Sequence, residues 1–401
     1  MLADFFEPAE RGVQHASLRA ANRRAVLTAI AFNPGLSNAD VSRRTGLAPQ
    51  TASAIVAELE DDGFVSRGEV LRGRRGQPAT PLFLDYAGAY GIGCEISWRH
   101  IDIMLVNVGS EELGRYRRDY VYPDPATIVA EATGAIADLV ARLDPAARAR
   151  IAGIGLALPS HMAELVSLVA PPEAAAAWAS LDLAGALEAA TELPVSPLND
   201  GNCACFAEMV FSQPPRSPNL VHLFVSTTLA AGITAEHTLR EGPTGNSANL
   251  GSMLVGSSTG ERRLGHDLAS TLALKRRLAA AGFAYPTGNP IDWPWQDWEP
   301  HITAWVDEAG GAMAEIIYNT AAVLELDQAI IDSGTPPEIV ERLIAATERA
   351  LATLSRVGVH LPRLVAGKLG NRAAPLGAAE LTMFRKHFSR DLSHMLAEEA
   401  S

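Results

Sequence analysis

The chain has 401 residues, of which 48% are hydrophobic and 20% are charged. This composition is ordinary for a globular protein, and the length predicts two or three folding units. No apolar run approaches the roughly 18 residues that a membrane-spanning helix needs, and the start of the chain does not have the pattern of a secretory leader. The three cysteines are too few for a disulfide framework, so we expect a cytoplasmic protein with no membrane partner.

The net charge of -13 is distributed unevenly along the chain. Residues 1–84 contain 10 basic and 9 acidic residues, whereas the remainder contains 23 basic and 37 acidic residues. Affinity for DNA depends on basic side chains that neutralise phosphates. Any contact with DNA is therefore expected from a local basic surface at the front of the chain.

The front of the chain has the pattern of a helix-turn-helix. Apolar residues at helical spacing predict a helix over residues 18–32, which an Asn-Pro-Gly run ends. Ser37 is the predicted N-cap of a short second helix, with Asp40 three residues later. After a turn at Gly46, Pro49 fits the first position of a third helix. An ordinary helical hairpin inside a core is the alternative interpretation of these residues.

The third helix is the predicted recognition helix. Its core face consists of Ala52, Ile55, Val56 and Leu59. The opposite face carries short side chains that let a helix approach base edges, and glutamine can pair with adenine. The acidic residues at the far end of the helix would be repelled by phosphate, so only its amino-terminal end should enter the major groove. The predicted DNA contacts on this helix are Gln50, Thr51 and Ser53.

A β-hairpin wing is predicted directly after this helix. Two short strands, near residues 64–65 and 82–84, flank a segment in which arginines alternate with glycines. A slim arginine-bearing tip suits the narrow, electronegative minor groove. A solvated linker is the alternative, but it does not explain why the segment follows a helix-turn-helix. The predicted DNA contacts on the wing are Arg72, Arg74, Arg75 and Gln77.

From Tyr90 onward, strands and helices alternate. Strands are predicted at 91–96, 100–108, 151–159, 220–226 and 328–334, and helices at about 125–143 and after Leu264 and Trp305. Such alternation predicts an α/β body, in two lobes with a cleft between them.

Along nearly its whole length the sequence resembles the ROK family of repressors and sugar kinases, and within that family the NagC/XylR-type regulators. The motifs that carry the resemblance lie at residues 46–53, 73–78, 153–159, 198–202 with Glu208, and 370–379. The resemblance implies an actin-like, hexokinase-like (ribonuclease H-like) two-lobed body that binds a sugar in its cleft. The expected domains are a winged helix-turn-helix at 1–86, a first lobe at 87–198 with a carboxy-terminal helix at 375–392, and a second lobe at 199–374.

The sequence departs from the family kinases at both phosphate loops. Where those kinases have an Asp-x-Gly-Gly-Thr turn that holds nucleotide phosphates, residues 95–99 read Glu-Ile-Ser-Trp-Arg. The second loop, a Gly-Thr-Gly-type turn in the family, is replaced by residues 226–230, which contain no glycine. Phosphoryl transfer depends above all on positioning the nucleotide and its metal. We therefore predict that the protein is not an enzyme, with a sugar kinase that has a degenerate nucleotide loop as the alternative.

The zinc site that the resemblance would imply is also missing. The family uses one histidine and three cysteines, but residues 249–252 read Asn-Leu-Gly-Ser and residues 256–265 contain no cysteine. His266 and Asp267 are adjacent, which makes them poor chelators, and no third ligand is near them in sequence. We expect no metal and no cofactor.

The sugar site is half preserved. Asn199 and Asp200 match the pair that hydrogen-bonds sugar hydroxyls in the family, although Asn-Asp is also a common turn dipeptide. At the other wall, Asn249 and Ser252 replace a glutamate and a histidine, and His266 falls near the family's later glutamate. We expect these five residues to bind an effector that is another sugar or a polyol, unless the response to ligand has been lost.

Together these features predict a transcriptional regulator, and specifically a repressor. Its expected partners are double-stranded DNA with an inverted-repeat operator, a sugar or polyol effector, and further copies of the chain in a dimer or tetramer. A sugar kinase and an effector-independent DNA-binding protein remain as alternatives.

Overall fold

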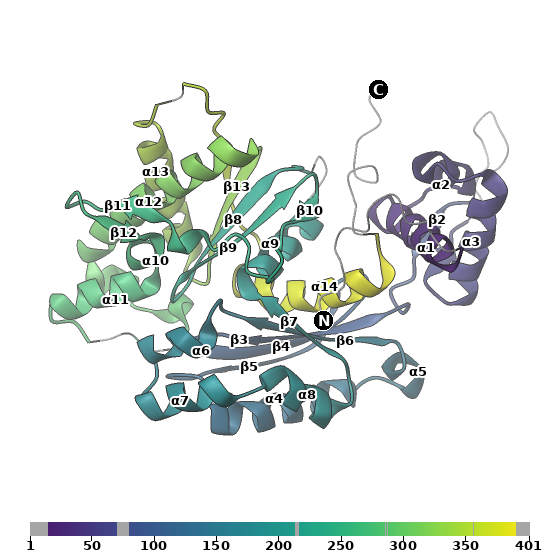
Figure 1. Cartoon of the computed structure of the whole chain (residues 1–401), viewed down its shortest axis with the longest axis horizontal. Coiled ribbons are helices and arrows are strands. Elements are labelled where there is room, and N and C mark those ends of the chain that lie inside the picture. Colours follow the sequence, from purple (N-terminus) through teal and green to yellow (C-terminus); the bar gives the residue numbers. More distant parts are fainter. Residues whose placement is uncertain are drawn as a thin grey trace. The chain divides into compact units, whose positions relative to one another are not determined.

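The computed structural model describes residues 15–69, 80–212, 216–284, 286, 288–355 and 357–389 (Figure 1). Its contacts divide the chain into two compact units. The first unit comprises residues 1–88 and 384–401, and the second comprises residues 89–383. No helix in the described ranges is both long enough and apolar enough to cross a bilayer.

The first unit contains the predicted helix-turn-helix. Its described elements are α1 (His15–Phe32), α2 (Asn38–Thr45), α3 (Pro49–Asp61), β1 (Val65–Arg67) and β2 (Leu82–Leu84). The capping box is present, because Ser37 Oγ accepts a hydrogen bond from Asp40 N at 3.3 Å while Asp40 Oδ2 accepts one from Ser37 N at 2.9 Å. Gly46 ends α2 in the left-handed conformation, with φ of 67°.

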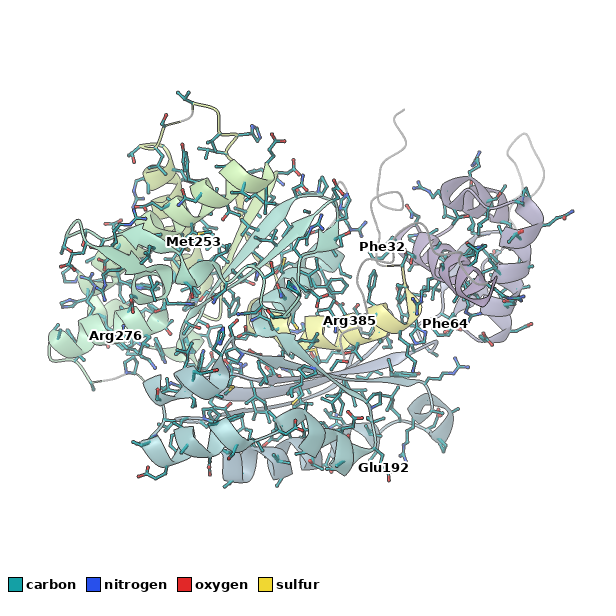
Figure 2. All side chains as sticks on the ribbon, viewed as in Figure 1. Phe32, Phe64, Glu192, Met253, Arg276 and Arg385 are labelled. Carbon is teal, nitrogen blue, oxygen red and sulfur yellow. The ribbon has the colours of Figure 1, made fainter. Side chains whose placement is uncertain are left out.

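The core of the first unit includes a segment from the other end of the chain. The ring of Phe384 meets Phe32 edge-on with centroids 6.5 Å apart, and the imidazole of His387 lies 4.9 Å from the ring of Phe64 (Phe32 and Phe64 are labelled in Figure 2). The backbone N–H of Ser389 donates to Thr28 Oγ1 at 2.8 Å. The carboxy-terminal segment therefore helps to stabilise the unit that carries the recognition helix.

Acidification should weaken this unit through His387. Burial, followed by the nearby charges of Lys386, Arg23 and Arg24, lowers the pKa of His387 to about 4. The folded unit thus favours the neutral imidazole, so its contribution to the free energy of unfolding is present above about pH 6.5 and is lost as the pH falls toward about 4. Thermal unfolding of the wild type and of His387→Gln at several pH values tests this. The wild type should lose more stability than the variant, and parallel curves would contradict the assignment.

The first lobe of the second unit is built on one mixed sheet. In the described residues this sheet has five strands in the order β5-β4-β3-β6-β7. β3, β4 and β5 form an antiparallel meander, and β6 and β7 continue the sheet in parallel from β3. The strands are β3 (Tyr90–Ile96), β4 (His100–Asn107), β5 (Glu112–Asp119), β6 (Ile151–Leu158) and β7 (Val195–Asn199). The helices of this lobe are α4 (Pro125–Val140), α5 (Pro145–Arg148), α6 (Met162–Leu165), α7 (Pro172–Ser180) and α8 (Leu183–Thr191).

The second lobe repeats this topology. Its described sheet has the order β10-β9-β8-β13-β14, again an antiparallel meander continued by two parallel strands. The strands are β8 (Leu220–Val225), β9 (Leu229–Ala235), β10 (Thr238–Leu239), β13 (Gln328–Ser333) and β14 (Arg363–Ala366), and β11 (Leu254–Gly256) pairs separately with β12 (Arg262–Leu264). The helices are α9 (Asp200–Phe211), α10 (Gly265–Leu268), α11 (Thr271–Ala280), α12 (His301–Leu324) and α13 (Pro337–Leu351).

The last helix, α14 (Ala373–His387), packs against the first sheet at positions that require glycine. A Cβ on Gly93 would lie 1.7 Å from the carbonyl oxygen of Pro375, and a Cβ on Gly155 would lie 2.2 Å from that of Ala378. Both contacts are with backbone atoms, which cannot move aside cheaply. Gly93 in β3 and Gly155 in β6 are therefore explained by the close approach of this helix.

Candidate functional site

The exposed face of α3 carries the residues predicted to contact DNA. Gln50, Thr51 and Ser53 are all exposed, whereas the predicted core residues of the same helix are buried. Pro49 occupies the first helical turn. The residue before it, Ala48, is the N-cap, and no side chain of the described residues caps this end of the helix with a hydrogen bond. The first-turn N–H groups are therefore left for water or for a phosphate oxygen, which a helix amino terminus attracts.

Three acidic residues at or just beyond the other end of α3 (Glu58, Glu60 and Asp62) are paired within the first unit. Arg67 holds Glu60 through two hydrogen bonds, of 2.6 and 2.7 Å. Arg23 lies 2.7 Å from Asp62, and Arg19 forms an ion pair with Glu58. The carboxylates lie near the carboxy-terminal end of α3 and already hold these arginines. The amino-terminal half of α3, which carries no acidic residue, is therefore the part suited to a polyanion such as DNA.

The strands of the predicted wing are present. β1 and β2 pair antiparallel, with Val65 opposite Leu84 and Arg67 opposite Leu82. The predicted wing contacts Arg72, Arg74, Arg75 and Gln77 lie outside the described residues.

In the second unit, all five residues predicted to bind an effector line one cleft of about 530 Å³. Asn199 and Asp200 lie where β7 ends and α9 begins. Asn249 precedes a short 3-10 turn that Ser252 ends, and His266 is the second residue of α10. The volume is within the range of about 300–1,000 Å³ that small-molecule sites occupy. Tertiary structure thus brings together five residues that the sequence holds in three separate segments.

Two side chains at one wall are held by the start of α9. Asn199 Oδ1 caps the helix by accepting from Asn202 N at 2.9 Å, and its Nδ2 donates to Ser160 Oγ at 2.9 Å. Asp200 Oδ1 accepts from Gly201 N at 2.7 Å. Burial, and then the charge of Glu95, raise the pKa of Asp200 to about 7. The carboxyl group therefore exchanges its proton near neutral pH.

The opposite wall is neutral. His266 Nδ1 accepts a hydrogen bond from Leu229 N at 3.2 Å, which places the ring proton on Nε2, 3.3 Å from Ser252 Oγ. Burial lowers the pKa of His266, in agreement with a neutral ring. This wall offers an imidazole and a hydroxyl group to a polar, uncharged ligand.

The absence of a side chain at Gly251 leaves room for the imidazole of His266, so Gly251→Ala should displace that ring and destabilise the fold. A Cβ there would lie 2.2 Å from His266 Cε1 and 2.5 Å from the carbonyl oxygen of Leu229. Overpacking of this kind costs about 1–3 kcal/mol in the free energy of unfolding. Gly311→Ala in α12 is the matched control, because its new methyl group would meet no atom of the described residues within 4 Å outside its own helical turn, and alanine favours a helix. Denaturant unfolding should show a loss for Gly251→Ala only, and equal stability of the two variants would contradict the prediction.

The cleft also contains polar residues that sequence analysis did not single out. Ser160 and His161 follow β6, and both bond to Asn246, with His161 Nε2 3.2 Å from Asn246 Nδ2. At the rim, Arg276 Nη1 donates to Asp267 Oδ1 at 3.1 Å (Arg276 is labelled in Figure 2). In the sequence, the Pro-Ser-His run directly after a buried strand could have pointed to Ser160 and His161, since ligands bind at the carboxyl ends of parallel strands.

The positions that the family resemblance assigns to the phosphate loops contact each other. Trp98, in the turn between β3 and β4, is only 2% exposed, and its Nε1–H donates to Thr228 Oγ1 at 3.3 Å. Thr228 lies in the corresponding turn between β8 and β9. Beyond these turns the remaining cavity has a volume of about 50 Å³, which is far too small for a nucleotide.

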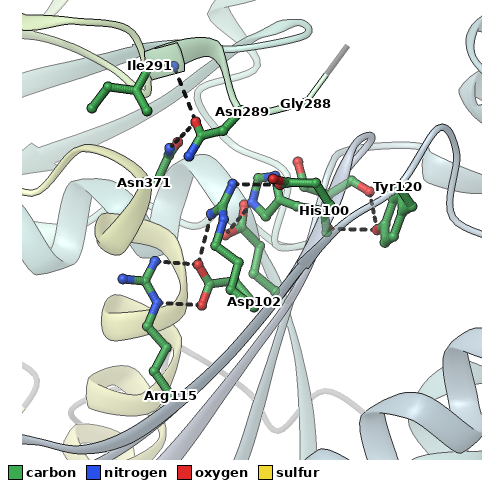
Figure 3. A network of polar contacts seen from close by, with 12 residues as sticks. His100, Asp102, Arg115, Tyr120, Gly288, Asn289, Ile291 and Asn371 are labelled. Atoms are coloured by element: carbon green, nitrogen blue, oxygen red, sulfur yellow. Dashed lines mark hydrogen bonds and ion pairs between the residues drawn. The ribbon is translucent and has the colours of Figure 1, made fainter.

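Charged side chains around this small cavity bond to one another (Figure 3). Arg115 holds the buried carboxylate of Asp102 through two hydrogen bonds, of 2.8 and 2.5 Å, and Arg117 adds a third of 2.9 Å. The hydroxyl of Tyr120 lies 2.7 Å from the carbonyl oxygens of both Ser97 and His100, and so fixes the turn that carries Trp98.

Comparisons with known proteins agree with this architecture. A family profile described as the ROK family matches residues 91–384, and one described as a winged helix-turn-helix DNA-binding domain matches residues 19–66. The uncharacterized protein y4fQ of Sinorhizobium fredii is 21% identical over 369 residues, 92% of each chain. N-acetylmannosamine kinase of Vibrio cholerae is 29% identical over 157 residues, which cover 38% of this chain and 54% of the kinase.

Among solved structures, a ROK family transcriptional regulator described as a homolog of the E. coli MLC protein has a TM-score of 0.69 at 20% identity, covering 94% of this chain and 98% of its own. This likeness confirms the predicted fold class, a winged helix-turn-helix with a two-lobed α/β body, and the family matches confirm the predicted resemblance.

Proposed function

We propose that this protein, which belongs to the ROK family, is a transcriptional repressor that binds an operator through its winged helix-turn-helix and a small polyhydroxylated effector in the cleft of its body. The observation that carries the proposal is the exposed face of α3, where Gln50, Thr51 and Ser53 follow a helix start for which the described residues provide no side-chain cap. A homo-oligomer would present two such helices. We therefore expect an inverted-repeat operator with half-sites about one helical turn, or a multiple, apart.

The cleft supports a sugar or polyol as the effector. Its polar groups come from several elements and combine an amide, a carboxyl group, an imidazole and a hydroxyl, all suited to hydroxyl-rich ligands. A thermal-shift screen of sugars, polyols and sugar phosphates tests this, because a ligand that binds the native state raises its melting temperature. A broad panel without a hit would favour an effector-independent DNA-binding protein.

The contact of Trp98 with Thr228 supports a sensor rather than a sugar kinase. The indole occupies the place between the lobes where a family kinase would hold nucleotide phosphates, and phosphoryl transfer requires that place. An ADP-release assay over the same panel of sugars should give no turnover. Turnover that Asp200→Asn abolishes would establish the kinase alternative.

The wing provides a direct test of DNA binding. From the sequence we expect Arg74 and Arg75 to reach the minor groove, so replacing both with alanine should weaken operator binding about ten-fold in a gel-shift assay at fixed salt. Arg262→Ala/Arg263→Ala is the control, because it makes the same change in net charge on an exposed strand of the body. Equal affinities of the two double variants would rule out the wing as a DNA contact.

A further inference from the structure

Three buried side chains that the proposed function does not use converge inside the second lobe. Glu208 lies on α9, His222 on β8 and Asp332 on β13, and they are 3%, 0% and 3% exposed. One potential ligand atom from each side chain lies within 4.8 Å of the other two. These residues are named the Glu–His–Asp cluster below.

Backbone N–H groups donate hydrogen bonds to both acidic side chains of the cluster. Glu208 Oε1 accepts hydrogen bonds from two consecutive N–H groups of the loop 367–370, at 2.7 and 2.9 Å. Asp332 accepts one from Ser333 N at 2.7 Å and another from the N–H at the end of the same loop, at 3.0 Å. The loop 367–370 therefore bonds to both acidic side chains and fixes their orientation inside the lobe.

The histidine of the cluster has no hydrogen bond to account for its burial. Neither ring nitrogen of His222 has a partner among the residues that the structure describes, and Nε2 lies 3.9 Å from Asp332 Oδ2, beyond hydrogen-bond distance. Leaving a buried polar group unsatisfied destabilises the folded state, so buried imidazoles are normally paired. A fully buried histidine whose ring nitrogens have no partner in the described residues, beside two buried acidic side chains, points to a cation between them.

We propose that the Glu–His–Asp cluster binds one divalent transition-metal ion, with zinc as the reference case. Two acidic side chains can supply carboxylate ligands that balance the charge of a divalent ion, and the unpartnered imidazole can supply a nitrogen ligand. Imidazole nitrogen together with carboxylate oxygen is a ligand set that zinc accepts, at about 2.0–2.2 Å from each atom.

The spacing of the ligand atoms is close to what such an ion needs. Ligands on opposite sides of an ion lie about 4.2 Å apart and neighbouring ligands about 3–3.5 Å apart, given these bond lengths. The 3.9 Å between His222 Nε2 and Asp332 Oδ2 falls inside that span. The other separations are within 4.8 Å, so the side chains would have to close by roughly half an ångström or somewhat more at most. Water would complete the coordination.

The ion would connect four parts of the second lobe. It would join α9, β8 and β13 directly, and through the N–H groups that hold both carboxylates it would also fix the loop 367–370, which leads into α14. This site differs from the cysteine-containing zinc site of the family, whose ligands this chain lacks. The cluster is expected to contribute to the stability of the body whether or not an effector is bound.

The test begins with the unmodified full-length protein. Purified without chelator, it should contain about one equivalent of a transition metal by mass spectrometry. After the metal has been stripped, adding Zn²⁺ should raise its melting temperature by roughly 5 °C. Co²⁺ in place of Zn²⁺ should give visible absorption and an X-ray absorption spectrum with one imidazole nitrogen among oxygen ligands. Less than a tenth of an equivalent of bound metal, or a Co²⁺ spectrum without imidazole, would overturn the proposal.

Substitutions in the Glu–His–Asp cluster then test whether the metal binds there. His222→Gln and Asp332→Asn should each weaken Zn²⁺ binding about 100-fold in calorimetry. His237→Gln is the matched control, because His237 is also a buried histidine of the second lobe but lies outside the cluster. Binding that His222→Gln retains would place the metal elsewhere and overturn the proposal. If His222→Gln does not fold, the Co²⁺ spectra of the wild type and of Asp332→Asn decide, and identical spectra would count against the cluster.

Discussion

Ser53→Glu should lower the affinity for operator DNA about 100-fold or more at fixed salt, which corresponds to about 3 kcal/mol at 25 °C. The side chain of Ser53 is exposed on the amino-terminal half of α3, the part expected to enter the major groove. The substitution removes a short side chain that lets the helix approach base edges and places a carboxylate near phosphates. Glutamate is a good helix former, so the fold of the first unit should not change. The measurement is a gel shift with an operator selected from a randomised duplex pool by the wild type.

Ala57→Glu is the matched control for this substitution. Ala57 is also exposed on α3, one helical turn farther from its amino terminus and beside the acidic residues that end the helix. It should reduce affinity by less than about ten-fold, because the charge lies farther from the bases and phosphates. Melting temperatures of both variants should match the wild type. Equal losses of affinity in the two variants would mean that the amino-terminal end of α3 is not the reading surface.

Binding of a hydroxyl-rich ligand in the cleft should strengthen about ten-fold between about pH 6 and pH 8, and Asp200→Asn should abolish this dependence. The pKa of Asp200 is raised to about 7 by burial and by the charge of Glu95, so the ionised fraction rises from about a tenth to about nine tenths over this range. An ionised carboxylate accepts stronger hydrogen bonds from sugar hydroxyls than a protonated carboxyl group does. Calorimetry at each pH, with a ligand found in the thermal-shift screen, measures the effect.

The raised pKa of Asp200 also affects stability, but in the opposite direction: ligand binding should strengthen as the pH rises, whereas the contribution of Asp200 to stability should fall. Because the folded state raises the pKa of Asp200 above the ordinary value of 3.8, the folded protein binds the proton more tightly than the unfolded chain. The contribution of this group to stability is full below about pH 4 and is lost as the pH rises through about 7. The stability of Asp200→Asn relative to the wild type should therefore increase with pH.

Asp267→Asn, at the rim of the cleft, is the control for the ligand-binding experiment and should leave the pH dependence of ligand binding unchanged.

Local sequence signals predicted the first unit closely. The Ser37 and Asp40 pair, the glycine at 46 and the proline at 49 each act within one helical turn, so they specify the ends of α2 and α3 without help from the rest of the chain. The same reasoning did not predict that residues 384–389 complete the core of this unit. Packing between segments at opposite ends of the chain leaves no local signature.

In the body, the predicted strands were those with continuous apolar runs. β3, β4, β6, β8 and β13 are almost entirely buried, and their composition shows it. β5 was not predicted, because three arginines and an aspartate fill much of this partly exposed strand. Two of those arginines, Arg115 and Arg117, bind the buried carboxylate of Asp102 on the neighbouring strand β4.

Contiguous residues were enough to predict the winged helix-turn-helix, the two-lobed α/β body and the loss of glycine from both phosphate loops, because each of these is a local feature of the chain. Folding in three dimensions was needed to show that Trp98 contacts Thr228, that five dispersed polar residues line one cleft, and that Glu208, His222 and Asp332 meet in the core. The expectation that no metal binds rested on a search for ligands close together in sequence. Strand register and helix packing set the distances between residues far apart in the chain, and neither can be read from a local pattern.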